Sequence, residues 1–454
     1  MTDSGVDRAW IDREWIERVT GGEITRLEPM PGGGSRAMYF LDVAIGDRTE
    51  ELVVRREEGG GPYAGTALGS LDREATVYRA LGGQGVPIPE LRGISDDGRT
   101  LVATRLGGSN DYHGITDPDA KAAVRRDFLD VLARLHALDP VELGLEGLGT
   151  SGNARDHTRA WIGVWRELFE TQIRRPVPLL RFALGWLDDH APSTERRPVV
   201  CHGDVGPGNF LFSDGAVTGL LDWELCHIGD PHDDLGMLAL RAHQLNAFGD
   251  LDEDLRHYRS VSGLDVDAGQ VRFHRAVALV LGLTTSVMQL DRSGDARIQV
   301  PLYLHLVPTL RLFLAAALAE LLDLDVEDPL APDDQADEGT LEAIAALGAE
   351  VAALRAADEP VLGAGPSDLV AHLDAVARFG QAVDAADLDD LEAVLGRRAD
   401  SYDEGVAALD AAIAAGRVDP VAVVRSELRS ARRRRVLWPS WAVASAMPLL
   451  PINL

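Results

Sequence analysis

The segment that decides the fold runs from Val199 to Leu235 and reads VVCHGDVGPGNFLFSDGAVTGLLDWELCHIGDPHDDL. Two apolar runs, Phe210–Phe212 and Val217–Leu221, flank a Ser-Asp-Gly turn, which is typical of a β-hairpin. Asp204 stands on the loop before this hairpin, and Asp222 directly follows the hairpin. The segment therefore places one carboxylate at each end of a hairpin, within a region whose apolar spacing is otherwise helical.

These polar residues match the needs of phosphoryl transfer. That reaction requires a carboxylate at the attacking hydroxyl and oxygen ligands for the metal ions that bridge the phosphates. Asp204 is a candidate catalytic carboxylate, and Asn209 and Asp222 offer the hard oxygen donors that Mg²⁺ prefers. Taken singly, Asp, Asn and Gly are ordinary turn residues. Their joint spacing favours the catalytic interpretation.

The pattern HGDxxxxN, followed by a hairpin, D-W-E and GDPxxDL, resembles the catalytic core of the aminoglycoside phosphotransferase family. Its layout is also similar to that of choline kinases and of the protein-kinase catalytic loop. The resemblance implies an α+β, protein-kinase-like fold in two lobes, with a small antiparallel sheet in the N-lobe and a mainly helical C-lobe. It further implies that Asp204 orients or deprotonates the acceptor hydroxyl, His202 braces the loop, and Asn209 and Asp222 hold Mg²⁺. ATP or GTP would be the phosphoryl donor.

The first hundred residues alternate strand-like and turn-like segments. We expect strands at Ile24–Leu27, Met38–Val43, Glu51–Arg56 and Thr100–Leu106, and a helix at Leu71–Leu81. By the resemblance, a glycine-rich turn between the first two strands covers the phosphates, the third strand carries a cation, the helix carries its carboxylate partner, and the last strand ends in the adenine-binding hinge. These roles fall on Gly32, Gly33, Gly34, Ser35, Arg55, Glu74, Thr104, Arg105 and Leu106.

The cation of the third strand departs from protein kinases, which place lysine there. Lys121 is the only lysine in the chain, so a P-loop ending in Gly-Lys-Ser/Thr is excluded and arginine stands at position 55. Arginine at this position also resembles the choline-kinase and acyl-dehydrogenase-associated branches of the family. Its planar fork keeps a phosphate contact but changes the geometry of that contact.

Composition bounds the partners. The 454 residues carry a formal charge of -29, which argues against nucleic acid as a partner, because phosphate backbones are bound through clustered Lys and Arg. The two cysteines, Cys201 and Cys226, are too few for a disulfide scaffold, and the acidic N-terminus lacks a secretion signal. We therefore expect a cytoplasmic protein. The apolar stretches around Ala276–Leu290 and Leu312–Leu322 are expected to be core helices, not transmembrane segments.

The predicted domain organisation has four parts. They are an N-lobe at 1–106, a C-lobe at 107–324, an acidic linker at 325–340 and a helical accessory module at 341–454. The module contains the run Arg432–Arg435, which is interpreted as a solvated helix end with a docked tail. The alternative for this run is a basic membrane-surface anchor.

Two other functions fit the sequence less well. The crowded His and Asp residues between His202 and Asp234 are also typical of a metal-dependent phosphohydrolase, but a hairpin inside the ligand set argues against it. A nucleotide-binding pseudokinase scaffold has no need of Asp204, Asn209 and Asp222 together. The acceptor stays open between a cationic alcohol and a hydroxyacyl thioester, and the oligomeric state is not predicted. Candidates for the acceptor pocket are Trp161, Trp165, Asp291 and Arg292.

Overall fold

The computed structural model describes residues 12–30, 36–57, 63, 65–245, 250–292, 300–354, 366–439 and 449–454. The chain divides into two compact units. The first comprises residues 1–151, 197–234 and 247–265, and the second comprises residues 152–196, 235–246 and 266–454. The predicted hairpin segment therefore belongs to the same unit as the N-terminal strands. The domain boundaries expected from the sequence stay a prediction.

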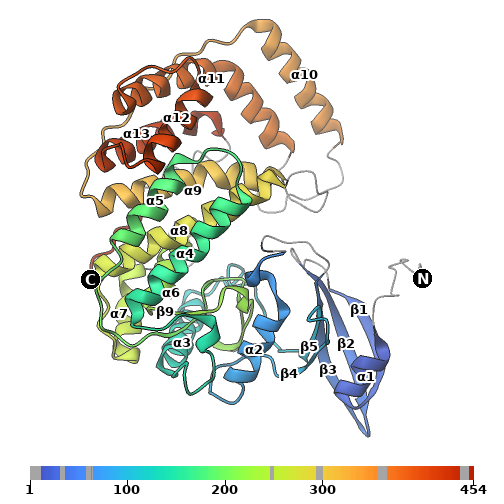
Figure 1. Cartoon of the computed structure of the whole chain (residues 1–454). Coiled ribbons are helices and arrows are strands. Elements are labelled where there is room, and N and C mark those ends of the chain that lie inside the picture. Colours follow the sequence, from blue (N-terminus) through green and yellow to red (C-terminus); the bar gives the residue numbers. More distant parts are fainter. Residues whose placement is uncertain are drawn as a thin grey trace. The chain divides into compact units, whose positions relative to one another are not determined.

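A five-stranded antiparallel sheet forms the N-terminal part of the first unit (Figure 1). Its spatial order is β1 (Glu23–Pro29), β2 (Ala37–Ile45), β3 (Arg48–Arg56), β5 (Thr100–Thr104) and β4 (Leu91–Ile94). Strand β4 was not predicted. It has only four residues, all of them half-buried, and so it lacks the alternation of buried and exposed residues that marks a strand in a sequence.

Two helices cover opposite faces of this sheet. Helix α1 (Arg13–Thr20) packs Trp15 and Ile16 against Leu52, Val54 and the other buried residues of one face. Side chains alternate along a strand, so Val53 and Arg55 of β3 face the other way. Helix α2 (Leu71–Leu81), at the bounds that the sequence predicts, presents its buried Glu74 to Arg55.

The segment that decides the fold forms two small sheets in the same unit. Strand β6 (Val199–Cys201) pairs with β9 (His227–Gly229), and β7 (Phe210–Ser213) pairs with β8 (Ala216–Leu220). The turn of the second pair has positive φ at Asp214 (51°) and Gly215 (81°), as a two-residue hairpin turn requires. The predicted hairpin is therefore confirmed. Helices α3 (Pro118–Ala137) and α7 (Leu251–Ser262) complete the unit.

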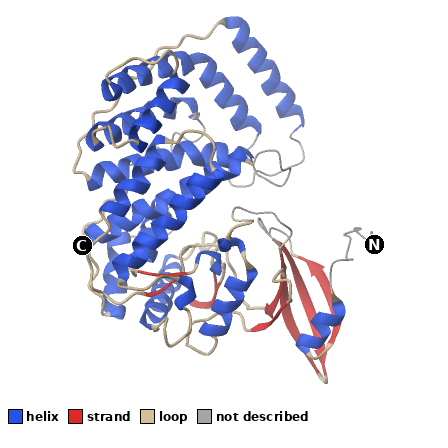
Figure 2. Ribbon diagram, in the orientation of Figure 1, coloured by secondary structure: helices blue, strands red, loops and turns tan. Residues whose placement is uncertain are grey.

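The second unit is helical (Figure 2). Its helices are α4 (Ala154–Gln172), α5 (Pro178–Asp189), α8 (Ala268–Asp291), α9 (Val300–Leu321), α10 (Glu338–Leu354), α11 (Pro366–Leu395), α12 (Tyr402–Ala414) and α13 (Pro420–Arg434). Helix α6 (His232–Leu245) begins in the first unit and continues into the second. Short 3₁₀ turns lie at Ala67–Gly69, Glu146–Leu148 and Trp223–Leu225 in the first unit, and at Arg435–Leu437 in the second. Helix α11 joins two segments whose apolar residues have helical spacing, Leu369–Phe379 and Leu388–Leu395, in one continuous helix.

Among the described residues, α8 and the Leu302–Leu321 part of α9 are long and apolar enough to cross a membrane by length and composition alone. Within their most apolar windows, 83% of α8 and 56% of α9 is buried inside the protein. Burial of this kind is the behaviour of core helices and agrees with the interpretation made from the sequence.

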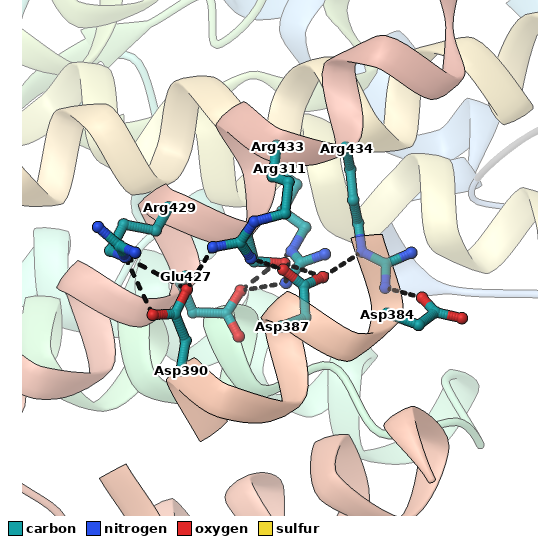
Figure 3. Close-up of polar contacts among 9 residues, drawn as sticks. Arg311, Asp384, Asp387, Asp390, Glu427, Arg429, Arg433 and Arg434 are labelled. Atoms are coloured by element: carbon teal, nitrogen blue, oxygen red, sulfur yellow. Dashed lines mark hydrogen bonds and ion pairs between the residues drawn. The ribbon is translucent and has the colours of Figure 1, made fainter. Parts of the chain in front are cut away.

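The arginine run of the C-terminus is not a solvated helix end, so this part of the prediction is wrong. Arg433 and Arg434 bind Asp387 of α11, and they also reach Asp390 and Asp384 (Figure 3). The carboxylates lie more than forty residues away in the sequence, so local context gives no sign of them. The tail itself is docked, because the Ile452 side chain is fully buried and its carbonyl accepts a hydrogen bond from Arg272.

Candidate active site

A cleft of about 680 Å³ lies within the first unit, between the sheet and the β7–β8 hairpin. Strands β2, β3 and β5 supply one wall, and the segment after β5 continues it. The loop before β7, Leu211 of β7 and the two residues after β8 supply the other wall. The described lining residues are Met30, Arg36, Met38, Phe40, Val53, Arg55, Tyr78, Pro89, Leu101, Ala103, Thr104, Arg105, Leu106, Gly108, Ser109, Asn110, Gly208, Asn209, Leu211, Leu221 and Asp222. The cleft thus brings together residues from both halves of the predicted site.

The predicted hinge lines this cleft. The backbone N–H of Thr104 donates to Glu90, at 2.9 Å, and that of Arg105 donates to Glu51, at 3.0 Å. Within the described part of the chain, the backbone N–H of Leu106 has no backbone carbonyl as its acceptor. The Arg105 guanidinium lies 4.2 Å from the ring centroid of Phe40. The hinge therefore offers one backbone donor beside a flat, partly apolar wall.

The predicted cation and its carboxylate partner are in contact. Arg55 binds Glu74, whose side chain is fully buried. Glu74 also accepts hydrogen bonds from Arg36 (2.9 Å) and from the Tyr78 hydroxyl (2.8 Å). Arg36 could not be predicted as a partner of Glu74 from the sequence. Arg36 stands at the edge of the glycine-rich turn, where no local pattern points to α2.

Two further carboxyl groups, those of Asp222 and Glu224, lie near these arginines. Asp222 Oδ1 is 3.6 Å from Arg55, and Glu224 Oε2 is 3.5 Å from Arg36. Burial raises the pKa of Asp222 above its ordinary value, against the attraction of Arg55. Burial, and then the charge of Asp222, raise the pKa of Glu224 to about 8. Asp222 adopts φ 62°, a left-handed conformation that Asp tolerates better than most residues.

The loop between β6 and β7 presents Asp204 and Asn209 together. Asn209 Nδ2 donates to both the carbonyl and Oδ2 of Asp204, each at 2.8 Å. His202 Nε2 donates to the Leu221 carbonyl at 2.8 Å, and its Nδ1 accepts the Asp204 N–H at 3.3 Å. Since the first partner only accepts and the second only donates, the ring is neutral with its proton on Nε2. His202 therefore ties the Asp204 loop to the residue before Asp222.

Asp234 binds the backbone of this loop through hydrogen bonds. Its two oxygens accept the N–H groups of His202 and Gly203, both at 2.8 Å, and His136 Nε2 donates to it at 3.0 Å. Burial alone would raise the pKa of Asp234, but the hydrogen bond and charge of His136 lower the pKa below its ordinary value. A Cβ at Gly203 would overlap the carbonyl oxygen of Leu225, so this position requires glycine. The geometry therefore gives Asp234 a structural role, in which it holds the backbone of the Asp204 loop.

The histidine-rich part of the segment does not line the cleft. His227 and His232 are 2% and 1% exposed, and they lie 3.4 Å and 2.6 Å from Asp233 and Asp230 respectively. These imidazoles are therefore tied to neighbouring carboxylates in the protein interior. A hydrolase would need them at an accessible metal, so the arrangement disfavours that alternative.

Other predicted residues lie elsewhere. Gly32, Gly33, Gly34 and Ser35 fall outside the described residues. Trp161 and Trp165 are buried in the second unit with their rings at a right angle, 5.5 Å apart, as core residues are. Asp291 pairs with Arg175, and Arg292 donates to Gln172. The assignment of these four residues to an acceptor pocket stays a prediction.

The profile of the phosphotransferase enzyme family matches residues 26–266, which cover most of the sheet, the cleft and the β7–β8 hairpin. The chain belongs to this family. It has the kinase-like fold that the sequence predicts, and a protein from Ralstonia eutropha described as an aminoglycoside phosphotransferase shares that fold. The two structures have a TM-score of 0.52 and 21% identity, over 66% of this chain and 93% of the other.

Two curated relatives are similar over nearly half of the chain. Acyl-CoA dehydrogenase family member 10 of Mus musculus is 27% identical over 230 residues, which cover 48% of this chain and 20% of that protein. Acyl-CoA dehydrogenase family member 11 of Gallus gallus is 27% identical over 212 residues, or 45% of this chain and 26% of that protein. The chain thus matches only about a quarter or less of these relatives' length.

Proposed function

We propose that this protein is a small-molecule kinase, which transfers the terminal phosphoryl group of ATP or GTP to a hydroxyl group in a Mg²⁺-dependent reaction. The observation that supports this most is the convergence of Arg55, Asn209 and Asp222 on one cleft, with Asp204 held beside Asn209. Family membership supports the reaction class. A hydrolase or a nucleotide-binding scaffold has no comparable support.

Each described residue has a separate task in this proposal. The Leu106 N–H binds the nucleotide base, and Arg55, held by the buried Glu74, binds the phosphates. Asp204 accepts a hydrogen bond from the acceptor hydroxyl and aligns its oxygen with the terminal phosphorus. It takes the proton as this oxygen bonds to phosphorus and the bond from that phosphorus to the bridging oxygen breaks, which releases the nucleoside diphosphate. The hydrogen bond from Asn209 keeps the Asp204 carboxylate in one orientation.

The residues present fit a magnesium ion. Asn209 directs its amide nitrogen to Asp204, which leaves the carbonyl oxygen Oδ1 for a cation. Asp222 lines the same cleft and its side chain is 40% exposed, so its carboxylate is accessible to a cation. Bound Mg²⁺ would neutralise the phosphates and polarise the transferring group.

The proposed acceptor is a small molecule with a hydroxyl group, and two classes of acceptor are considered, a cationic alcohol and a hydroxyacyl thioester. The net charge of -29 favours a cation, such as an amino alcohol or an antibiotic sugar. Arginine at position 55 resembles the branch associated with hydroxyacyl thioesters, and the names of the curated relatives favour including that class. Both classes therefore belong in one acceptor screen.

Thermal unfolding tests the proposal first. The protein is melted with no nucleotide, with ATP and with GTP, each with and without Mg²⁺. A nucleotide at one hundred times its Kd adds about 2.7 kcal/mol to the free energy of unfolding, so the melting temperature must rise with nucleotide and Mg²⁺ together. Absence of a shift with either nucleotide would refute the kinase function. A positive result leads to the acceptor screen, read out as ADP or GDP release.

A further inference from the structure

Arg36 joins two parts of the cleft that the proposed reaction must keep in register. One end of its guanidinium, Nη1, binds Glu74 of α2 at 2.9 Å. The other end, Nη2, lies 3.5 Å from Glu224, two residues after the proposed magnesium ligand Asp222, and also donates to the Gly69 carbonyl. Only 4% of the Arg36 side chain is exposed, yet it lines the cleft. This residue has no counterpart among the roles that the sequence predicted.

Together the side chains form a chain in which carboxyl groups and guanidinium groups alternate. The order is Asp222, Arg55, Glu74, Arg36 and Glu224, and each carboxyl group lies beside a guanidinium group. Both ends of the chain therefore lie on the segment that follows β8, and its middle lies on α2. One arginine would suffice to neutralise Glu74. The second therefore adds a link between α2 and the 222–224 segment, and only a forked, bidentate cation can make this link to two separate carboxylates.

We infer that Arg36 is a positioning residue for magnesium-dependent nucleotide binding, which sets Asp222 in register with the phosphate-binding Arg55. The inference rests on the proposed function. Without Arg36, Glu224 loses its guanidinium partner beside Asp222. Arg55 then remains as the guanidinium that joins Glu74 of α2 to Asp222, while Arg73 of α2 still donates to the Cys226 carbonyl. Arg55 and the hinge stay in place, so the cost falls on the part of nucleotide binding that magnesium supplies.

The test compares nucleotide affinity with and without Mg²⁺ by calorimetry, for the unchanged protein, four single variants and one double variant. The quantity of interest is the ratio of the Kd without Mg²⁺ to the Kd with Mg²⁺. For Arg36→Gln this ratio should fall about 10-fold, which is a typical coupling between two sites, while the Kd without Mg²⁺ changes little. Glu224→Gln, which removes the same link from its other end, should lower the ratio in the same direction. Arg36→Lys should give an intermediate ratio, because an ammonium group cannot bridge both carboxylates.

Arg56→Gln is the matched control. Arg56 follows Arg55 on β3, but its guanidinium donates to Thr100, so the ratio should equal that of the unchanged protein. The double variant Arg36→Gln/Glu224→Gln should match Arg36→Gln, because one link is lost in either case.

The outcomes separate the inference from the proposed function. If the unchanged protein does not bind nucleotide with Mg²⁺, the proposed function fails and the inference fails with it. If it binds and Arg36→Gln keeps the full ratio, only the inference is overturned. An equal loss of affinity with and without Mg²⁺ would also overturn it, because that is the result for a direct phosphate contact or a general loss of structure. Should Arg36→Gln fail to fold, Glu224→Gln decides alone, and an unchanged ratio in that variant overturns the inference.

Discussion

Replacing Asp387 by Asn should destabilise the second unit, because this carboxylate is the centre of the ion-pair network between α11 and α13 (Figure 3). Asp387 is 1% exposed. It binds Arg433 and Arg434 and accepts a hydrogen bond from Ser430 at 2.9 Å. The amide keeps the shape of the side chain but removes its charge and turns one acceptor into a donor. Two largely buried guanidinium groups are then left without a full counter-charge.

Removing one partner of a buried ion pair costs about 3–5 kcal/mol, and the lower end applies here because Asp390 and Asp384 still face Arg433 and Arg434. For a unit of roughly 250 residues, each kcal/mol lowers the melting temperature by about 2–4 °C, so the second unit should melt about 6–12 °C earlier. Differential scanning calorimetry measures this shift directly.

Asp389→Asn provides the control on the same helix. Its carboxylate is 69% exposed and pairs with Arg398, so this change should cost about 0.5 kcal/mol or less. If Asp387→Asn melts within about 2 °C of Asp389→Asn, the network does not stabilise the unit and the reasoning is refuted.

Three further predictions concern catalysis, metal binding and acid stability. Asp204→Asn should lower turnover about 10²- to 10⁴-fold while the nucleotide Kd stays nearly unchanged; substantial turnover would contradict a role as catalytic base. Asp222→Asn keeps a residue that tolerates φ 62° but removes the charge, so the Mg²⁺-dependent rise in melting temperature should disappear; an undiminished rise would exclude Asp222 as a ligand. Burial, and then the charge of Arg275, lower the pKa of His243 to about 4, so its stabilising contribution is present above about pH 6.5 and is lost as pH falls towards 4. His243→Leu should therefore reduce, by up to about 3 kcal/mol, the free energy of unfolding that is lost between about pH 6.5 and pH 4. An equal pH dependence of unfolding in both proteins would rule this out.

Much of the fold could be predicted from local patterns. The hairpin of β7 and β8 follows from two apolar runs around a turn, and α2 appears at its predicted bounds. Strand β4 was missed because four half-buried residues carry no periodic signal. Helix α11 could not be predicted as one element, because a weakly apolar stretch interrupts its pattern, although a helix can continue through such a stretch when its neighbours pack against it.

The candidate site shows the same division. Asp204, Asn209 and Asp222 lie on one short segment, where their spacing along the chain carries the chemical meaning. The links that hold them do not. Asp234 reaches His136 across 98 residues, and Arg36 reaches Glu74 across 38. No sequence pattern in a single chain relates positions so far apart.

The sequence by itself determined the hairpin, the acidic residues at its ends and the alternation that turns Arg55 away from the α1 face of the sheet. These features follow from turn geometry and from the two-residue period of a strand, which act over a few residues. Only the tertiary structure decided which charges meet. The arginine run at 432–435, interpreted as solvated, finds its carboxylates on α11 because folding brings α13 against that helix. Burial then makes pairing necessary, since an unpaired charge in the interior would lose its hydration without compensation.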